Sequence, residues 1–93
     1  MSELITEILN GEVYQYDPLG KHVVRAMGVC GNRPTFKYTR IEIAGVLDRL
    51  AAGETIEEIV SSYRGRISHE AVIEAVQIVM SGFLKTLPEL ESV

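Results

Sequence analysis

The chain has 93 residues, of which 46% are hydrophobic and 24% charged, and this composition is typical of one globular domain over residues 1–93. No apolar run reaches the roughly 18 to 20 residues that cross a bilayer, and the acidic N-terminus lacks the basic start of an export signal. We therefore expect a cytoplasmic protein with no membrane partner, and its one cysteine, Cys30, fits a reducing compartment. The net charge of −4 argues against nonspecific binding to nucleic acid.

The first 41 residues predict a short helix followed by a small sheet. Ser2 is a candidate N-cap for the helix, and Asn10-Gly11 is a natural stop. The apolar positions of this helix are Leu4, Ile5, Ile8 and Leu9. Strand-favouring residues at 12–16 and 21–29 flank a turn at 17–20, and residues 35–41 favour a third strand. We expect residues 1–20 to be an N-terminal extension and residues 12–41 to hold a β-hairpin or small sheet.

Residues 42–87 predict three helices. The first has one apolar face and ends before Gly53, and the second begins at a capping box formed by Thr55 and Glu58. Ser68 is the expected cap of the third. Residues at helical spacing on the first two helices are Ile43, Val46, Leu47 and Leu50, then Ile56, Ile59, Val60 and Tyr63. We therefore expect a mainly α fold, with a helix-turn-helix-like (homeodomain-like) bundle of three helices at residues 42–87.

The third helix is apolar around most of its circumference. Its polar residues form one narrow stripe, which consists of Glu70, Glu74, Gln77, Ser81 and Lys85. Such a helix is either the central element of a small core or is covered on a second side by another subunit. The acidic residues of the stripe would face phosphates in a DNA groove, so we do not expect this helix to read DNA.

Charges are separated along the chain. Residues 1–20 carry four acids and no Lys or Arg, residues 21–40 carry five bases and no acid, and residues 41–93 carry nine acids and four bases. A basic segment between acidic ones either contacts phosphate or pairs with acids of its own chain, and we favour the second interpretation. The candidate nucleic-acid contacts are Arg33, Lys37, Arg40, Arg64 and Arg66.

No catalytic constellation is recognisable, so we expect no enzyme and neither cofactor nor metal. His22 and His69 lie far apart in sequence, and neither has partners at metal-binding spacing. Aromatic residues beside the bases either stack on nucleobases or, as we favour, pack a small sheet against helices. These aromatic residues are Tyr14, Tyr16, Phe36 and Tyr38.

A chain of this length gains stability from dimerisation, because its own core is small. We expect a homodimer that covers the apolar end of the third helix and the strand edges of the first half, as a sheet shared between two N-terminal halves would do. The candidate interface residues, for a second copy or for another protein, are Val13, Tyr16, Val23, Met80, Phe83, Leu84 and Leu87.

Several short motifs occur in the order typical of one protein family. They are Gly31-Asn32-Arg33-Pro34, Tyr38-Thr39-Arg40-Ile41, Leu50-Ala51-Ala52-Gly53, Glu57-Glu58-Ile59 and the run from Ser68 to Ala75. On these motifs, residues 22–80 resemble the domain-of-unknown-function 433 family, which is similar to small helix-turn-helix domains. Some members look like antitoxins, so the resemblance implies binding to a toxin nuclease and repression of the chain's own promoter. Asn32 and Tyr38 stand where the family prefers Gly, and Tyr38 predicts that its loop is reshaped toward strand.

Two functions follow as hypotheses. The first is a dimeric antitoxin-like or transcription-regulatory module that binds DNA through its basic residues. The alternative is a protein-interaction or structural module without DNA binding, whose acidic helices meet a basic protein partner.

Overall fold

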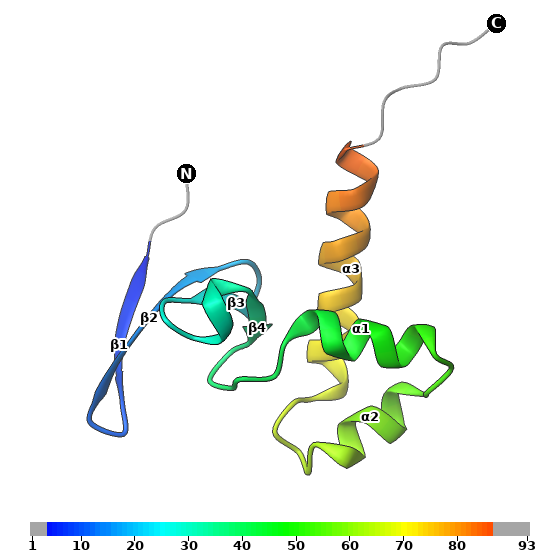
Figure 1. Cartoon of the computed structure of the whole chain (residues 1–93), viewed down its shortest axis with the longest axis horizontal. Helices are drawn as coiled ribbons and strands as arrows, with labels where there is room; N and C mark the ends of the chain where they lie inside the picture. Colours follow the sequence, from blue (N-terminus) through cyan, green and yellow to red (C-terminus); the bar gives the residue numbers. More distant parts are fainter. Residues whose placement is uncertain (1–3, 87–93) are drawn as a thin grey trace, which may run out of the picture.

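The computed structural model describes residues 4–86, which form a four-stranded antiparallel sheet followed by three helices (Figure 1). The strands are β1 (Ile5–Leu9), β2 (Glu12–Pro18), β3 (Val23–Ala26) and β4 (Pro34–Phe36), and they pair in chain order. A short 3-10 turn, η1 (Cys30–Asn32), lies between β3 and β4. The helices are α1 (Ile43–Ala51), α2 (Ile56–Ser62) and α3 (His69–Thr86).

The prediction of a mainly α fold is wrong, because residues expected to form an N-terminal helix form β1 instead. Asn10 and Gly11 have φ angles of 53° and 82°, so they close a two-residue hairpin between β1 and β2. Turns of this kind need positive φ at both central residues, which Asn-Gly provides. The same dipeptide also ends helices, and here it joins two strands. The fold is therefore mixed, with a sheet of four strands beside three helices.

The three helices lie where periodicity and capping place them. The capping box of α2 is confirmed: the amide of Glu58 donates to Thr55 Oγ1 at 3.1 Å, and the amide of Thr55 donates to the Glu58 carboxylate at 2.8 Å. At the start of α3, the amide of Ala71 donates to Ser68 Oγ at 3.0 Å. Local sequence signals thus fix both helix starts.

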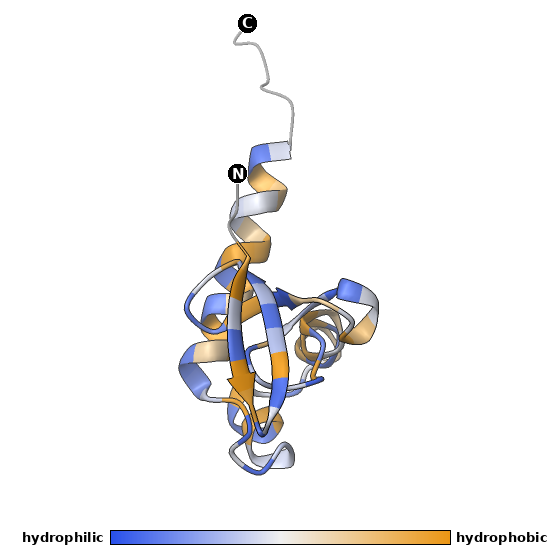
Figure 2. Ribbon diagram, turned by 90° about the vertical axis from the view of Figure 1, so that its left-hand side faces the viewer, coloured by the Kyte–Doolittle hydropathy of each residue, from blue (hydrophilic) through white to orange (hydrophobic). Residues whose placement is uncertain are grey.

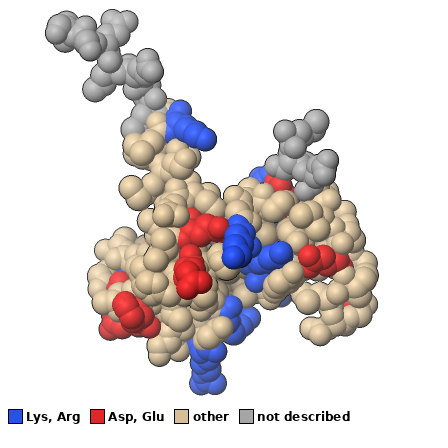
Figure 3. All heavy atoms as spheres, turned by 180° about the vertical axis from the view of Figure 1, so that it is seen from behind, with Lys and Arg blue, Asp and Glu red and all other residues tan. Residues whose placement is uncertain are grey.

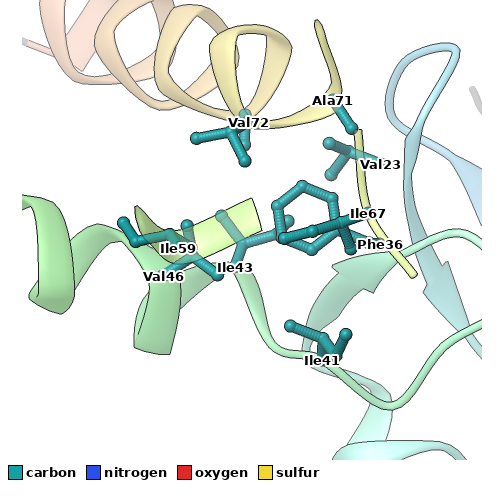
Figure 4. Close-up of a cluster of buried hydrophobic side chains, with 10 residues drawn as sticks. Val23, Phe36, Ile41, Ile43, Val46, Ile59, Ile67, Ala71 and Val72 are labelled. Atoms are coloured by element: carbon teal, nitrogen blue, oxygen red, sulfur yellow. The ribbon is translucent and has the colours of Figure 1, made fainter. Parts of the chain in front are cut away.

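The main core lies between the helices and one face of the sheet (Figure 4). Phe36 and Val23 extend from the sheet toward residues of all three helices. The helix residues buried in this core include Ile43, Val46, Ile59, Val72 and Ala75. A smaller cluster of Tyr16, Val24 and Ala26 lies on the other face of the sheet, because successive strand residues point to opposite faces.

The loop after β4 differs from the expected third strand over residues 35–41. β4 ends at Phe36, and Tyr38 has a φ of 67°, in the left-handed region that Gly adopts freely. Asn32 also has a left-handed backbone conformation, with a φ of 63°. The Thr39 hydroxyl stabilises the turn by donating to the Phe36 carbonyl at 2.8 Å and accepting from the Ile41 amide at 3.0 Å. The prediction that Tyr38 reshapes this loop toward strand is therefore wrong.

The sheet and the helices lie at opposite ends of the molecule, as Figure 1 shows. The β1–β2 hairpin is the part of the sheet farthest from the helices, and the C-terminal half of α3 extends beyond α1 and α2. Two features of the chain are therefore placed at its periphery: the outer edge of β1 and the end of α3.

Candidate functional site

An apolar groove lies between α1 and α3, and we call it the α1–α3 groove. Its volume is about 220 Å³, and it opens beside β4 and the turn that joins β2 to β3. Its lining is almost wholly apolar and includes Leu19, Pro34, Ile43, Leu47, Ile78 and Val79. The floor is formed by the buried faces of the two helices, so the same periodicity that builds the core also builds the groove.

Leu19, which lines the groove, lies in a turn that a side chain of α3 holds in place. Both oxygens of the Glu74 carboxylate accept backbone hydrogen bonds, from the amide of Lys21 at 2.9 Å and from the amide of His22 at 2.7 Å. Gly20 allows this close approach, since a Cβ there would lie 2.7 Å from Glu74 Oε1. This contact fixes the turn that carries Leu19 against α3.

One rim of the groove carries a charged pair. Arg33 Nε donates to Glu42 Oε1 at 2.7 Å, and Arg33 Nη2 donates to Glu42 Oε2 at 3.2 Å. Hydrogen bonding to Arg33 lowers the pKa of Glu42 below its ordinary value, and the Glu42 carboxylate raises the pKa of Arg33 in turn. Both groups are partly solvent-exposed, so they form a neutralised polar border beside an apolar surface.

The groove continues into exposed apolar residues on the projecting part of α3, which we call the α3 row. The row consists of Val79, Met80, Phe83 and Leu84, with exposed fractions of 43%, 58%, 61% and 60%. Val79 belongs to both surfaces, because it also lines the groove. Figure 2 shows hydrophobic residues on α3 beyond the level of the sheet. Ala71, Val72 and Ala75 at the beginning of α3 are buried in the chain's own core, so this part of the helix is a central core element. The alternative, that another subunit covers α3 on a second side, stays a prediction for the exposed end.

The five predicted nucleic-acid contacts are not brought together. Arg33 is paired with Glu42, and Lys37 Nζ lies 5.0 Å from the ring centres of both Tyr16 and Tyr38. Hydrogen bonding to Tyr16, and then to Tyr38, raises the pKa of Lys37. Arg33 therefore pairs with an acid of its own chain, as the favoured interpretation expects, whereas Lys37 lies over two aromatic rings.

Arg40 and Arg66, in contrast, line one shared hollow of about 420 Å³ with Tyr14 and Tyr38. Within residues 4–86, the guanidinium groups of Arg40, Arg64 and Arg66 form no ion pair. Arg64 lies in a turn with a φ of 55°. On the face in Figure 3, positive side chains gather in the middle and lower part, and negative side chains lie on both sides of them.

The predicted interface residues fall into three groups. Val13 is 70% exposed, and Met80, Phe83 and Leu84 belong to the α3 row. Tyr16 and Val23 are only 2% exposed, because each packs into one of the two cores, so they offer almost no surface to a partner and this part of the prediction is corrected. Leu87 lies outside the described residues.

Sequence reasoning missed two polar contacts. Glu74 belongs to the polar stripe of the third helix, and its carboxylate holds the turn at residues 21–22. Glu7 accepts hydrogen bonds from the hydroxyls of Tyr16 and Tyr38, each at 2.8 Å. Each contact joins residues that are distant in sequence or lie on different strands, so no local spacing indicates it.

Among residues 4–86, no group of three or more His, Cys, Asp or Glu side chains is arranged to hold a metal ion. Cys30 is half-buried, with its Sγ 3.4 Å from the Arg40 carbonyl oxygen. No helix in the described part of the chain combines the length and apolar character needed to cross a membrane.

Comparison with known proteins gives one match. The model of a family described as a protein of unknown function (DUF433) matches residues 23–77, which is more than half of the 93 residues. The match lies within residues 22–80, where the motifs indicated the same resemblance, and it leaves β1 and β2 outside. No curated protein and no solved structure matches the chain.

Proposed function

The chain belongs to the DUF433 family of proteins of unknown function, and we propose from its own surfaces that it is a protein-interaction module. In this proposal the α1–α3 groove and the α3 row together bind an amphipathic helix of a partner protein. The observation that carries it is the continuity of the two surfaces through Val79, which gives one apolar strip from the groove to the end of α3. A toxin protein, which the family resemblance implies, would be one partner of this kind.

The amount of exposed apolar surface supports this proposal. Complete burial of a fully exposed side chain of this size contributes about 1.5–3 kcal/mol. The four side chains of the α3 row are each about half exposed, so covering the whole row contributes about twice that amount. Amphipathic helices commonly bind such grooves through apolar residues spaced three and four positions apart. An apolar row beside a groove with a polar border has the shape and chemistry of that kind of site.

Charge indicates which helix would fit. The helical half, residues 41–93, carries nine acids against four bases, whereas the apolar strip itself is uncharged apart from Arg33 and Glu42 on its rim. A helix with an apolar face and basic flanks complements both features, and charge complementarity increases the rate of association and excludes acidic partners.

The test compares tagged forms of the chain in pull-downs from the cells that naturally make it. The test variant carries Val79→Glu and Phe83→Glu, and the matched control carries Met27→Glu, because Met27 is similarly exposed but lies beside the sheet. We expect the wild type and the control to recover the same protein, and the test variant to lose it. Recovery of the same proteins by all three forms would contradict the proposal.

A second candidate function, binding to DNA phosphates, is favoured by the shared position of Arg40 and Arg66 in one hollow. In a band-shift experiment at about 50 mM salt, the double variant Arg40→Ala and Arg66→Ala should bind every duplex more weakly, whereas Arg33→Ala should change little because Glu42 already holds Arg33. Absence of any shift with micromolar wild-type protein would exclude this function.

A further inference from the structure

β1 is a free edge of the sheet. The strand order is β1-β2-β3-β4, and the other edge strand, β4, is followed by a bridge between Thr35 and Glu42 that leads into α1. Within residues 4–86, β2 is the only strand paired with β1. The outer edge of β1 therefore presents unpaired backbone donors and acceptors.

The hydrogen-bond pattern identifies the residues that present these groups. The carbonyl of Gln15 accepts from the amide of Met27 at 2.8 Å, so the backbone groups of Gln15 point away from β1. Because bonded and non-bonded pairs alternate along an antiparallel ladder, Glu7 bonds to β2 whereas Thr6, which lies opposite Gln15, points its amide and carbonyl outward. Leu4 and Ile8, two positions on either side of Thr6, point their backbone groups in the same direction.

The usual features that protect an edge strand are missing from β1. Exposed edges normally carry Lys or Pro, or are bent by a bulge. β1 reads Ile-Thr-Glu-Ile-Leu and pairs with β2 in continuous register. Its one charged residue, Glu7, is held over the sheet face by the hydroxyls of Tyr16 and Tyr38. Figure 2 shows the strand at the front of the molecule.

We propose that the outer edge of β1 pairs antiparallel with β1 of a second copy, so that Thr6 lies opposite its counterpart and the two sheets join into one. This interface is separate from the α1–α3 groove and does not depend on the proposed function. It leaves the α3 row of each copy free for a partner protein.

The sequence of β1 is complementary to itself in this register. With Thr6 opposite Thr6, Leu4 of one copy lies opposite Ile8 of the other, on the face that also carries Val13. Leu4 and Ile8 are exposed by 50% and 69%, so pairing would bring these two apolar side chains of each copy against those of the other. A register centred on Glu7 would place two carboxylates directly opposite each other, which is unfavourable.

A cross-linking experiment tests the register. In a chain with Cys30→Ser, the variant Thr6→Cys should form an intermolecular disulfide on mild oxidation, because the Cα atoms of such a pair are about 5.5 Å apart. The matched control is Gln15→Cys, on the same face but one strand farther from the edge. Equal cross-linking of the two variants, or none with Thr6→Cys, would overturn the proposal.

A second variant tests the backbone pairing. Thr6→Pro removes the outward amide without removing a bond to β2, since proline is tolerated on the outer side of an edge strand. In sedimentation equilibrium we expect its dimer dissociation constant to rise by at least about tenfold, with unchanged circular dichroism. A wild-type chain that is monomeric at high micromolar concentration, or a dimer whose dissociation constant Thr6→Pro leaves unchanged, would overturn the proposal. If Thr6→Pro does not fold, the cross-linking result decides.

Discussion

Tyr38 holds a backbone conformation that Gly adopts without strain and that costs an L-residue about 1–2 kcal/mol. Its own contacts offset this cost: the amide donates to Tyr14 Oη at 2.9 Å, the hydroxyl donates to Glu7, and the ring lies 5.4 Å from that of Tyr14. Tyr38 belongs to the family-matched segment, whereas Glu7 and Tyr14 precede it. A residue inside the family-matched segment therefore attaches the hairpin that lies outside it.

We expect Tyr38→Ala to loosen the hairpin, because it removes the hydroxyl bond to Glu7 and the ring contact with Tyr14 and retains the strained backbone. Amide hydrogen exchange in β1 should accelerate by roughly tenfold, while exchange in α1 should be unchanged. Tyr38→Phe keeps the ring contact and loses the bond to Glu7, so it should have a smaller effect. Unchanged exchange in β1 of Tyr38→Ala would show that the hairpin does not depend on this residue.

The same contacts make the hairpin sensitive to pH. Hydrogen bonds from Tyr38 and then from Tyr16, with the nearby charge of Lys37, lower the pKa of Glu7 below its ordinary value. A carboxyl with a lowered pKa in the folded state stabilises that state above its unfolded pKa, and this stabilisation is lost as pH falls through the folded pKa. We expect β1 exchange protection to decrease below about pH 4, and Glu7→Gln to abolish that dependence. Equal pH dependence in both proteins would contradict this assignment.

At the scale of elements, Glu74 joins the two halves of the fold. Its carboxylate connects α3 to the turn between β2 and β3, more than 50 residues earlier in the chain. Periodicity places Glu74 in a polar stripe together with Glu70, and local spacing cannot distinguish a residue that binds a distant backbone from one that meets only solvent. The difference arises because the turn approaches α3 closely at Gly20.

We expect Glu74→Ala to lower the free energy of unfolding by about 1–3 kcal/mol, because two backbone amides lose a charged acceptor. Glu70→Ala on the same helix is the matched control and should change stability by no more than about 0.5 kcal/mol. Urea denaturation followed by circular dichroism measures both values. Similar values for the two variants would mean that the Glu74 contact contributes nothing measurable.

At the scale of the whole molecule, the apolar residues serve two separate purposes. Those of α1, α2 and the beginning of α3 meet Phe36 and Val23 in the core, whereas those at the end of α3 remain exposed. The N-terminal half of α3 thus stabilises the core, and its C-terminal half presents apolar side chains to solvent. The proposed interaction surface can therefore be altered without weakening the fold.

Two truncations test this separation. Ile59 is fully buried, so Ile59→Ala should cost about 2–5 kcal/mol of unfolding free energy. Phe83 is largely exposed, so Phe83→Ala should change the unfolding free energy by no more than about 0.5 kcal/mol. The same substitution should weaken binding of the partner. Chemical denaturation at low protein concentration measures both unfolding free energies. A large loss from Phe83→Ala would place the end of α3 in the chain's own core.

The sequence by itself determined the three helices, their caps and the family, because periodicity, capping boxes and short motifs are local and involve residues within a few positions of each other. Only the tertiary structure decided that residues 5–9 form a strand, that Tyr38 keeps a left-handed backbone, and that Arg33 and Lys37 are held by their own chain. Asn10-Gly11 is compatible with both a helix end and a hairpin, and pairing with β2 selects the hairpin. Contacts between distant segments decide each of these features, and no local pattern encodes which segments will meet.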